Sequence, residues 1–433
     1  MVKEHIYNYW DSDLPFVVNR NIKIDTETHL INDIVGVRRS GKTYLMMGVI
    51  KELLKKTDKK ATIYINFESR KLYPLTSDYF NQVVSFIYEE DLMDIYPRIY
   101  VFFDEVQKIK GWEQFVRSIY DEFKGKIKIF VSGSNTNLLS KDYGELLTGR
   151  HLTVNVHPLS FKEFLRFRNF NIEFLSDKKI VQVKKNLKEY LKSGGFPEIV
   201  LSEKKDILLD QLFNDILARD ILKRAVRKEQ IMEEFAYFLA SNISNLLSFN
   251  KMANYFKTRG IKVSVPTIEN YFYLMKNAFL FFDSLLFSYK VKDQLQYPRK
   301  VYCIDTGLIN LAGFKFSRDI GKLYENVVAI ELYRRFSSRP GVKVFYWKNS
   351  REKEVDFVIK EGLKIIQLIQ VSCFEKFEQM ASREIKSLLS ASEELECNDL
   401  LVVTSGCEGE KKFSFNKKNK MIKFIPLWKW LLN

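Results

Sequence analysis

The residues that most clearly carry chemistry are eight consecutive positions that fit the pattern G-x-x-x-x-G-K-[ST]. They are Gly36, Val37, Arg38, Arg39, Ser40, Gly41, Lys42 and Thr43. Glycines let a backbone curl so that its N–H groups point at phosphate oxygens, and the N-terminus of the following helix adds partial positive charge. Lys42 is suited to bind the β- and γ-phosphates, and the Thr43 hydroxyl is suited to ligate Mg²⁺. The pattern therefore predicts a site for a nucleotide and Mg²⁺. We expect the nucleotide to be ATP, with GTP as the alternative that the sequence leaves open.

Two carboxylates follow an apolar run downstream, where the second half of such a site is expected. Asp104 and Glu105 come directly after residues 99–103. We expect Asp104 to hold Mg²⁺ through water and Glu105 to polarise the attacking water as the general base. Two acids favour ATP hydrolysis over mere nucleotide storage. The alternative, a nucleotide-gated DNA-binding or scaffold protein with little turnover, has no need of a base at Glu105.

Further side chains are candidates for the same site. Ser134 lies in the turn at residues 132–135, where a polar group can position water or sense the γ-phosphate; a plain turn is the alternative. Arg150 is a candidate arginine finger for its own or a neighbouring chain, with an ordinary surface arginine as the alternative. Arg38 and Arg39 are candidates to face phosphate or another polyanion.

The elements that must position these residues alternate in type. Apolar runs at residues 31–35, 61–67, 99–103 and 127–131 are typical of strands, and residues 44–55 show a helical pattern. Strands that alternate with helices predict an α/β domain with a parallel sheet.

The rest of the chain divides into three further parts. Residues 161–235 are mainly helical, and residues 250–257 and 267–278 have the spacing of a helix-turn-helix within a winged helix. A helix at residues 324–336 and three later strands predict a second α/β domain. We expect the domains to be a P-loop core, a helical lid, a winged helix and a C-terminal domain, at residues 1–157, 158–235, 236–310 and 311–433.

Composition limits the class of protein. At about 150 residues per domain, 433 residues suggest about three domains, and a 46% hydrophobic content excludes a disordered chain. Lys and Arg number 69 against 54 Asp and Glu, so the formal net charge of +15 favours polyanionic partners. The four cysteines form no CxxC pair. Without a signal peptide or a long apolar run, we expect a cytoplasmic protein with no membrane span.

The motifs together resemble the archaeal and bacterial AAA-like P-loop ATPases that carry a C-terminal domain of unknown function with a restriction-endonuclease-like fold. Besides the residues above, the resemblance rests on short motifs at residues 103–107, 147–150, 158–161, 194–197, 219–221, 305–308, 324–326 and 354–357. It implies an ATPase core, a helical lid, a winged helix and a nuclease-like C-terminal domain.

Nucleases of that fold use a helix Glu, a strand Asp and then [DE]-x-Lys on the next strand. Glu325 and Asp356 occupy the first two places, but the third reads Gln370, Val371, Ser372. Glutamine is a poorer Mg²⁺ ligand than a carboxylate, and Ser372 supplies no ammonium group. We therefore expect a degenerate nuclease fold that is kept for binding or for docking a protein partner, and Gln370 and Ser372 disfavour the alternative of an ATP-dependent nuclease.

The winged helix is the candidate contact to double-stranded DNA. Its second helix carries Asn270, and four basic residues that precede that helix are placed to contact phosphates: Lys251, Lys257, Arg259 and Lys262. A Lys-rich C-terminal hairpin adds to the basic surface. The alternative is that the winged helix packs against the ATPase core or a protein partner.

Overall fold

The structure, a computed structural model, describes residues 1–134, 147, 149–173, 176–222, 229–311, 320–337, 339–416 and 418–433. Three residues of the predicted motifs and hairpin, Asn135, Thr148 and Lys417, lie outside the described residues. The chain divides into two compact units, which are Met1–His157 with Asn277–Phe279, and Pro158–Lys276 with Leu280–Asn433.

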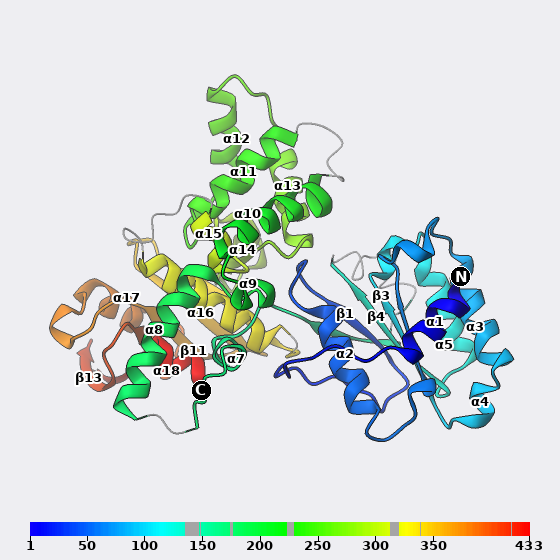
Figure 1. The fold of residues 1–433 in the computed structure, drawn as a ribbon. Helices are drawn as coiled ribbons and strands as arrows, with labels where there is room; N and C mark the ends of the chain where they lie inside the picture. The colour runs from blue at the N-terminus through cyan, green and yellow to red at the C-terminus, as the bar shows by residue number, and fades with distance from the viewer. Residues whose placement is uncertain are drawn as a thin grey trace. The chain divides into compact units, whose positions relative to one another are not determined.

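The first unit is built on a five-stranded sheet and is drawn in blue to cyan in Figure 1. Its helices are α1 Val2–Asp11, α2 Lys42–Leu53, α3 Asp78–Glu89, α4 Leu92–Ile95, the short turn η3 Val106–Lys108, and α5 Trp112–Glu122. Its strands are β1 Ile31–Val35, β2 Thr62–Asn66, β3 Ile99–Asp104, β4 Ile127–Gly133 and β5 His151–Asn155. The four predicted strands are confirmed to within two residues, and β5 was not predicted.

The strands of this sheet run parallel in the order β2-β3-β4-β1-β5. Residue Val35 at the end of β1 pairs with Gly133 of β4 on one side and with Asn155 of β5 on the other. The carboxyl ends of β1, β3 and β4 therefore meet at one edge, which is where a parallel α/β sheet places its ligand site. The prediction of an α/β domain with a parallel sheet is confirmed.

Both faces of this sheet are covered. Phe102 of β3 stacks on Phe130 of β4, with ring centroids 4.3 Å apart, and belongs to the apolar cluster that includes Met46 of α2. The next residue, Phe103, points to the opposite face and meets Phe80 of α3 at 4.9 Å. Strands buried on both faces read as continuous apolar runs, which explains why the sequence revealed them.

The second unit combines helices with a nine-stranded sheet. Its helices are α7 Phe161–Phe167, α8 Asp177–Ser193, α9 Pro197–Leu201, α10 Lys205–Asp215, the π-helical turn η5 Ile216–Ile221, α11 Glu229–Ser241, α12 Phe249–Thr258, α13 Val265–Asn277, α14 Val291–Gln296, α15 Thr306–Leu311, α16 Ile320–Phe336, α17 Ser382–Glu394 and α18 Leu427–Leu432. Its strands are β6 Leu246–Leu247, β7 Phe281–Leu286, β8 Arg299–Cys303, β9 Val342–Lys348, β10 Glu354–Glu361, β11 Lys364–Val371, β12 Leu400–Thr404, β13 Gly409–Phe415 and β14 Lys418–Pro426.

The nine strands follow the order β13-β14-β12-β11-β10-β9-β7-β8-β6. The antiparallel pair β7–β8 follows helices α12 and α13, and β7 continues the sheet through a parallel pairing of Leu285 with Phe345 and of Leu286 with Tyr346 of β9. One sheet thus runs from the predicted winged-helix segment into the predicted C-terminal domain, and the division between them at residues 310 and 311 stays a prediction. None of the described helices is long and apolar enough to cross a membrane.

Candidate functional site

The loop at residues 36–41 leaves β1 and enters α2, which begins at Lys42. Two of its glycines have positive φ values, 156° at Gly36 and 98° at Gly41, where side-chain-bearing residues are strained. A Cβ atom at Gly36 would also stand 2.1 Å from the carbonyl oxygen of Val156. Both glycines of the motif are therefore required by the backbone itself.

Lys42 lies buried inside this loop. Its Nζ donates hydrogen bonds to the carbonyl oxygens of Gly36 and Val37, each at 3.1 Å. The Ser40 hydroxyl is buried and has no hydrogen-bond partner among the described residues. A turned-in ammonium, a hydroxyl without a partner and a helix N-terminus form a cradle that fits the phosphates of a nucleotide.

Asp104 ends β3 and is fully buried beside this loop. Its Oδ2 accepts hydrogen bonds from the Thr43 hydroxyl at 2.7 Å and from the Tyr64 hydroxyl at 2.8 Å. Its Oδ1 accepts one from the Ser132 hydroxyl of β4. The sheet order brings these four residues together, and carboxylate and hydroxyl oxygens are the ligands that suit Mg²⁺.

Glu105 follows with φ of 56°, which turns the chain at the end of β3. Its N–H donates to the Ser132 hydroxyl at 3.1 Å, and its Oε2 accepts a hydrogen bond from the Gln107 amide at 2.5 Å. Burial raises the pKa of Glu105 above its usual value, while nearby Lys42 acts in the opposite direction. A carboxylate with a raised pKa is a better proton acceptor, which is the property that a general base needs.

The same amide lies near Ser134. Gln107 Nε2 is 3.5 Å from the Ser134 hydroxyl as well as bonded to Glu105. Sequence reasoning placed Ser134 at this edge but assigned no role to Gln107 or to Tyr64. The polar Tyr64 within the apolar run at residues 61–67 was the signal that could have pointed to a site.

Arg150 lies at the other edge of the sheet. It directly precedes β5, whose first residue, His151, pairs with Ile31 at the start of β1, whereas the phosphate loop follows the end of β1. Five strand residues at about 3.3 Å each separate the two edges. The Arg150 side chain instead lies 3.2 Å from Asp121 of α5. The geometry does not bring Arg150 to the phosphate loop of its own chain, so only the neighbouring-chain role stays a prediction.

The two arginines inside the phosphate loop differ in exposure. Arg38 is half-buried, and Arg39 is exposed with φ of 61°. Their proposed contact with phosphate or another polyanion stays a prediction.

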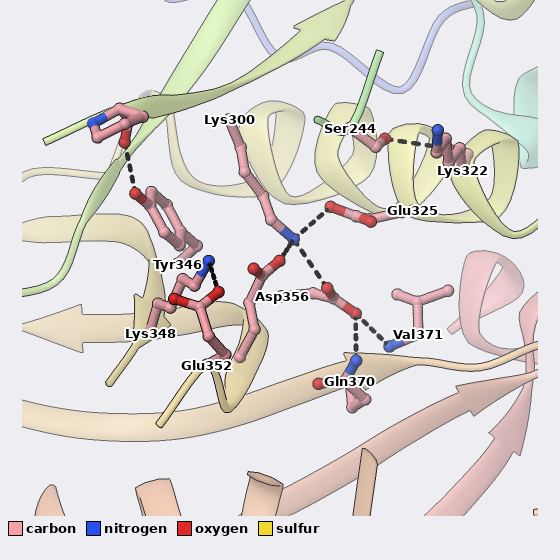
Figure 2. Close-up of polar contacts among 12 residues, drawn as sticks. Ser244, Lys300, Lys322, Glu325, Tyr346, Lys348, Glu352, Asp356, Gln370 and Val371 are labelled. Carbon is pink, nitrogen blue, oxygen red and sulfur yellow. Dashed lines mark hydrogen bonds and ion pairs between the residues drawn. The ribbon is translucent and has the colours of Figure 1, made fainter. Parts of the chain in front are cut away.

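The predicted nuclease-like residues of the second unit gather around a lysine that sequence reasoning missed. Nζ of Lys300, from β8, lies 2.9 Å from Glu325 of α16 and 2.9 Å from Asp356 of β10, and Figure 2 shows the lysine pointing between these two carboxylates. A third carboxylate, Glu354, lies 2.7 Å from the same nitrogen. Burial alone would lower the pKa of Lys300, but Asp356 and Glu325 outweigh this and raise the pKa well above its usual value. The ammonium is therefore charged, and it stands between the two carboxylates that a metal would need.

The third nuclease position also bonds within the protein. Gln370 donates its amide to Asp356 Oδ2 at 2.8 Å, and the Val371 N–H donates to the same oxygen at 2.9 Å. The Ser372 hydroxyl donates to Glu384 of α17. Among the residues that the structure describes, no group of three or more His, Cys, Asp or Glu side chains is arranged to hold a metal ion.

The nuclease pattern expects its ammonium at the position that Ser372 occupies in this chain. The structure supplies a lysine from β8 instead, about seventy residues earlier in the chain. The sequence signal was a lysine that begins the otherwise apolar run at residues 300–304.

Comparison with known proteins agrees with this geometry. Residues 28–165 match a family described as an AAA domain. Residues 184–318 and 320–430 match two domains of unknown function, DUF8612 and DUF4143. The match at residues 28–165 contains the phosphate loop, Asp104 and Glu105. The restriction-endonuclease-like fold of the C-terminal part stays a prediction.

Two relatives align over most of the chain. An uncharacterized protein of Methanocaldococcus jannaschii is 36% identical over 423 residues, which are 96% of this chain and 91% of the relative. An uncharacterized protein of Haemophilus influenzae is 34% identical over 346 residues, or 78% of this chain and 82% of the relative. The solved structure of a Walker-type ATPase of Pyrococcus abyssi aligns over 66% of this chain and 91% of that chain, with 14% identity and a TM-score of 0.43. The assignment of the first unit to the P-loop fold is therefore based on its strand order, its phosphate loop and the AAA-domain match, and not on this structural similarity.

Proposed function

We propose that this chain, which belongs to the AAA-like P-loop ATPase family, hydrolyses ATP in an Mg²⁺-dependent reaction and uses turnover as a switch or motor. The observation that carries the proposal is the hydrogen bond between Thr43 and Asp104 at 2.7 Å, directly beside the half-buried Glu105. A phosphate cradle alone would serve nucleotide storage, whereas a second acid at this point serves hydrolysis.

Each residue has a defined part in the reaction. The loop N–H groups and Lys42 bind the phosphates and hold the γ-phosphate in line for attack. Thr43 and Asp104 carry the oxygens that fit Mg²⁺, which when bound neutralises charge on the phosphate oxygens. Glu105 accepts a proton from the water whose oxygen bonds to the γ-phosphorus. The bond from that phosphorus to the β–γ bridging oxygen breaks, and ADP and inorganic phosphate leave.

Two candidates extend the site. Ser134 supports the water-positioning region through its proximity to Gln107. Arg150 would act as an arginine finger only on a neighbouring chain, because it lies at the opposite edge of its own sheet. Such a role requires an assembly of two or more chains.

Double-stranded DNA is the partner that we propose for helices α12 and α13. Lys251, Lys257 and Lys262 have exposed side chains, and Asn270 is exposed on α13. Tyr271 and Phe272 are buried, which leaves the exposed polar positions of the helix for contact. Arg259 forms an ion pair with Glu234, and this pairing reduces its availability for phosphate.

We further propose that the C-terminal part binds or docks a partner and does not cut phosphodiesters. The Lys300 ammonium forms ion pairs with the carboxylates of Glu325 and Asp356. The third position of the nuclease pattern carries Gln370 in place of an acid, and its amide bonds to Asp356. Divalent metal and ammonium cannot occupy the same place between two carboxylates.

The proposal is tested by steady-state release of phosphate from MgATP, with and without duplex DNA, across a salt series. The wild type should turn over ATP, and Lys42→Ala should lose both nucleotide binding and turnover. Stimulation by DNA that fades as salt rises would support the DNA partner, because phosphate contacts release counterions. Turnover that DNA leaves unchanged at every salt concentration would favour a protein partner. Turnover that survives in Lys42→Ala would contradict the ATPase assignment.

A further inference from the structure

The segment that follows β5 lies in backbone contact with the phosphate loop. Val156 donates its N–H to the carbonyl of Val35 at 2.7 Å. A Cβ atom at Gly36 would stand 2.1 Å from the carbonyl oxygen of Val156, so the two backbones touch with no side chain between them. A contact between two backbones cannot be relieved by a change of side-chain rotamer. A movement of the phosphate loop toward residue 156 would therefore displace this segment.

A buried arginine strengthens that contact. Arg20, from the segment between α1 and β1, is 9% exposed. Its Nη1 donates to the carbonyl of Ser40 at 3.0 Å, and its Nη2 donates to the carbonyl of His157 at 2.9 Å. The planar guanidinium offers two donors in a fixed fork, so it fixes the separation of the two carbonyls as a lysine cannot.

The next carbonyl is held by a second arginine. The chain passes from the first unit to the second at the peptide bond between His157 and Pro158. The carbonyl of Pro158 accepts a hydrogen bond from Arg334 of α16 at 3.1 Å, and Arg334 is itself paired with Glu331. Adjacent carbonyls are thus each bound by an arginine, Arg20 in the first unit and Arg334 in the second.

Leu159 lies where three sequence motifs that the ATPase site does not use come together. Its carbonyl accepts a hydrogen bond from the Tyr190 hydroxyl at 2.9 Å, and its N–H donates to the carbonyl of Gly195 at 2.7 Å. The Gly195 N–H in turn donates to Asp305 at 2.6 Å. A Cβ atom at Gly195 would lie 2.5 Å from the Leu159 carbonyl oxygen, which leaves no room for slack. The motifs at residues 158–161, 194–197 and 305–308 therefore meet at this residue.

We propose that Arg20 is a positioning residue of the nucleotide site, and that residues 156–159 carry changes at the phosphate loop into the second unit. Arg20 sets the place of the Ser40 carbonyl and ties it to His157. Arg334, Tyr190 and Gly195 receive the displacement on the far side of the peptide bond. The inference rests on the proposed function, because it takes the loop to be a nucleotide site.

The test compares Arg20→Met with a matched control, Arg98→Met. Arg98 also donates to backbone carbonyls in the first unit, those of Thr26, Glu27 and Gly125, but these lie outside the phosphate loop. In Arg20→Met we expect kcat for MgATP to fall about tenfold with a smaller change in KM, because misplacement of the loop affects the reacting geometry more than binding. Arg98→Met should keep the wild-type kcat, and Arg20→Lys should not restore it.

Hydrogen exchange measured by mass spectrometry supplies a second test. Substitution of an arginine with a purely structural role would not change how exchange responds to nucleotide. A non-hydrolysable ATP analogue should slow exchange in the phosphate loop and also in peptides spanning residues 158–167 and 190–201 of the wild type. In Arg20→Met the first effect should remain and the second should be lost. Arg334→Lys should likewise lose the second effect and leave the analogue's affinity at the phosphate loop nearly unchanged.

Two results would overturn the inference. One is an Arg20→Met protein that melts at a lower temperature but keeps wild-type kcat and the full exchange response. The other is a wild type that hydrolyses ATP without any exchange response beyond residue 157. A wild type that neither binds nor hydrolyses ATP would overturn the proposed function itself, which distinguishes the two failures.

Discussion

At the scale of single residues, Asp104 is a fully buried group of the nucleotide site that accepts several hydrogen bonds. Three hydroxyls, from Thr43, Tyr64 and Ser132, donate to its two oxygens, and they come from α2, β2 and β4. Hydrogen bonds to a charged acceptor are stronger than neutral ones, at about 1.5–3 kcal/mol each. The carboxylate is therefore held in one orientation in which it can serve a metal ion.

Tyr64→Phe tests that orientation. The change removes one donor to Asp104 and leaves the ring packing, so we expect the Mg²⁺ concentration that supports half-maximal ATP turnover to rise by about three- to tenfold, for a loss of about 1 kcal/mol. Tyr9→Phe is the matched control, because Tyr9 bonds to Thr62 at 2.8 Å in the same unit without touching Asp104. Equal Mg²⁺ dependence in both variants and the wild type would show that Tyr64 does not support the site.

Lys300 is the second residue on which much depends. Its removal leaves Asp356 and Glu325 buried without their cation, and breaking a buried ion pair costs about 3–5 kcal/mol. We expect Lys300→Met to lower the free energy of unfolding of the full chain by about that amount in urea titrations. Arg299→Met is the control on the same strand, because its partner Asp283 keeps Lys276. Mg²⁺-dependent cleavage of DNA by the wild type, abolished in Lys300→Met, would show a catalytic lysine instead.

At the scale of elements, the sequence predicts strands that are apolar in composition, and it misses strands that form only by pairing with a neighbouring strand. Strands β1, β3 and β4 are short, largely apolar runs that are buried on both faces, and this composition made them predictable. Strand β5 reads His-Leu-Thr-Val-Asn, is half-exposed, and becomes a strand only by pairing with β1. Likewise the phosphate loop and its acids are local signals, whereas Tyr64 and Lys300 join their sites across strands distant in sequence.

The pairing of β5 with β1 carries a pH dependence. His151 bonds to Asp33, and this hydrogen bond raises the pKa of His151 above its usual 6.5. Because the folded protein binds this proton more tightly than the unfolded chain does, the charged pair contributes its full stabilisation at pH values below 6.5. The stabilisation is lost as the pH rises through the pKa of His151 in the folded protein. Exchange of β5 amides should therefore be slower in the wild type than in His151→Gln at pH 5.5, with the difference much reduced at pH 8.5 once the intrinsic pH effect is corrected. A difference that does not change with pH would exclude the charged pair.

At the scale of the whole molecule, an AAA-like ATPase unit is joined to a second unit whose sheet runs through nine strands. Hydrolysis of ATP in the first unit could change the second unit only if Glu105 activates a water molecule while the nucleotide is bound. Glu105 is therefore the residue that decides whether the site hydrolyses ATP, because the other residues of the site would serve binding alone.

The most direct measurement is single-turnover cleavage of ATP already bound to the protein and started with Mg²⁺. The wild type should convert bound ATP to ADP and phosphate, and Glu105→Gln should bind ATP with comparable affinity while it cleaves at least about a hundredfold more slowly. Glu52→Gln, which removes an exposed acid of the same unit that pairs with Lys55, is the control and should cleave at the wild-type rate. Cleavage at the wild-type rate by Glu105→Gln would contradict the assignment of Glu105 as the base.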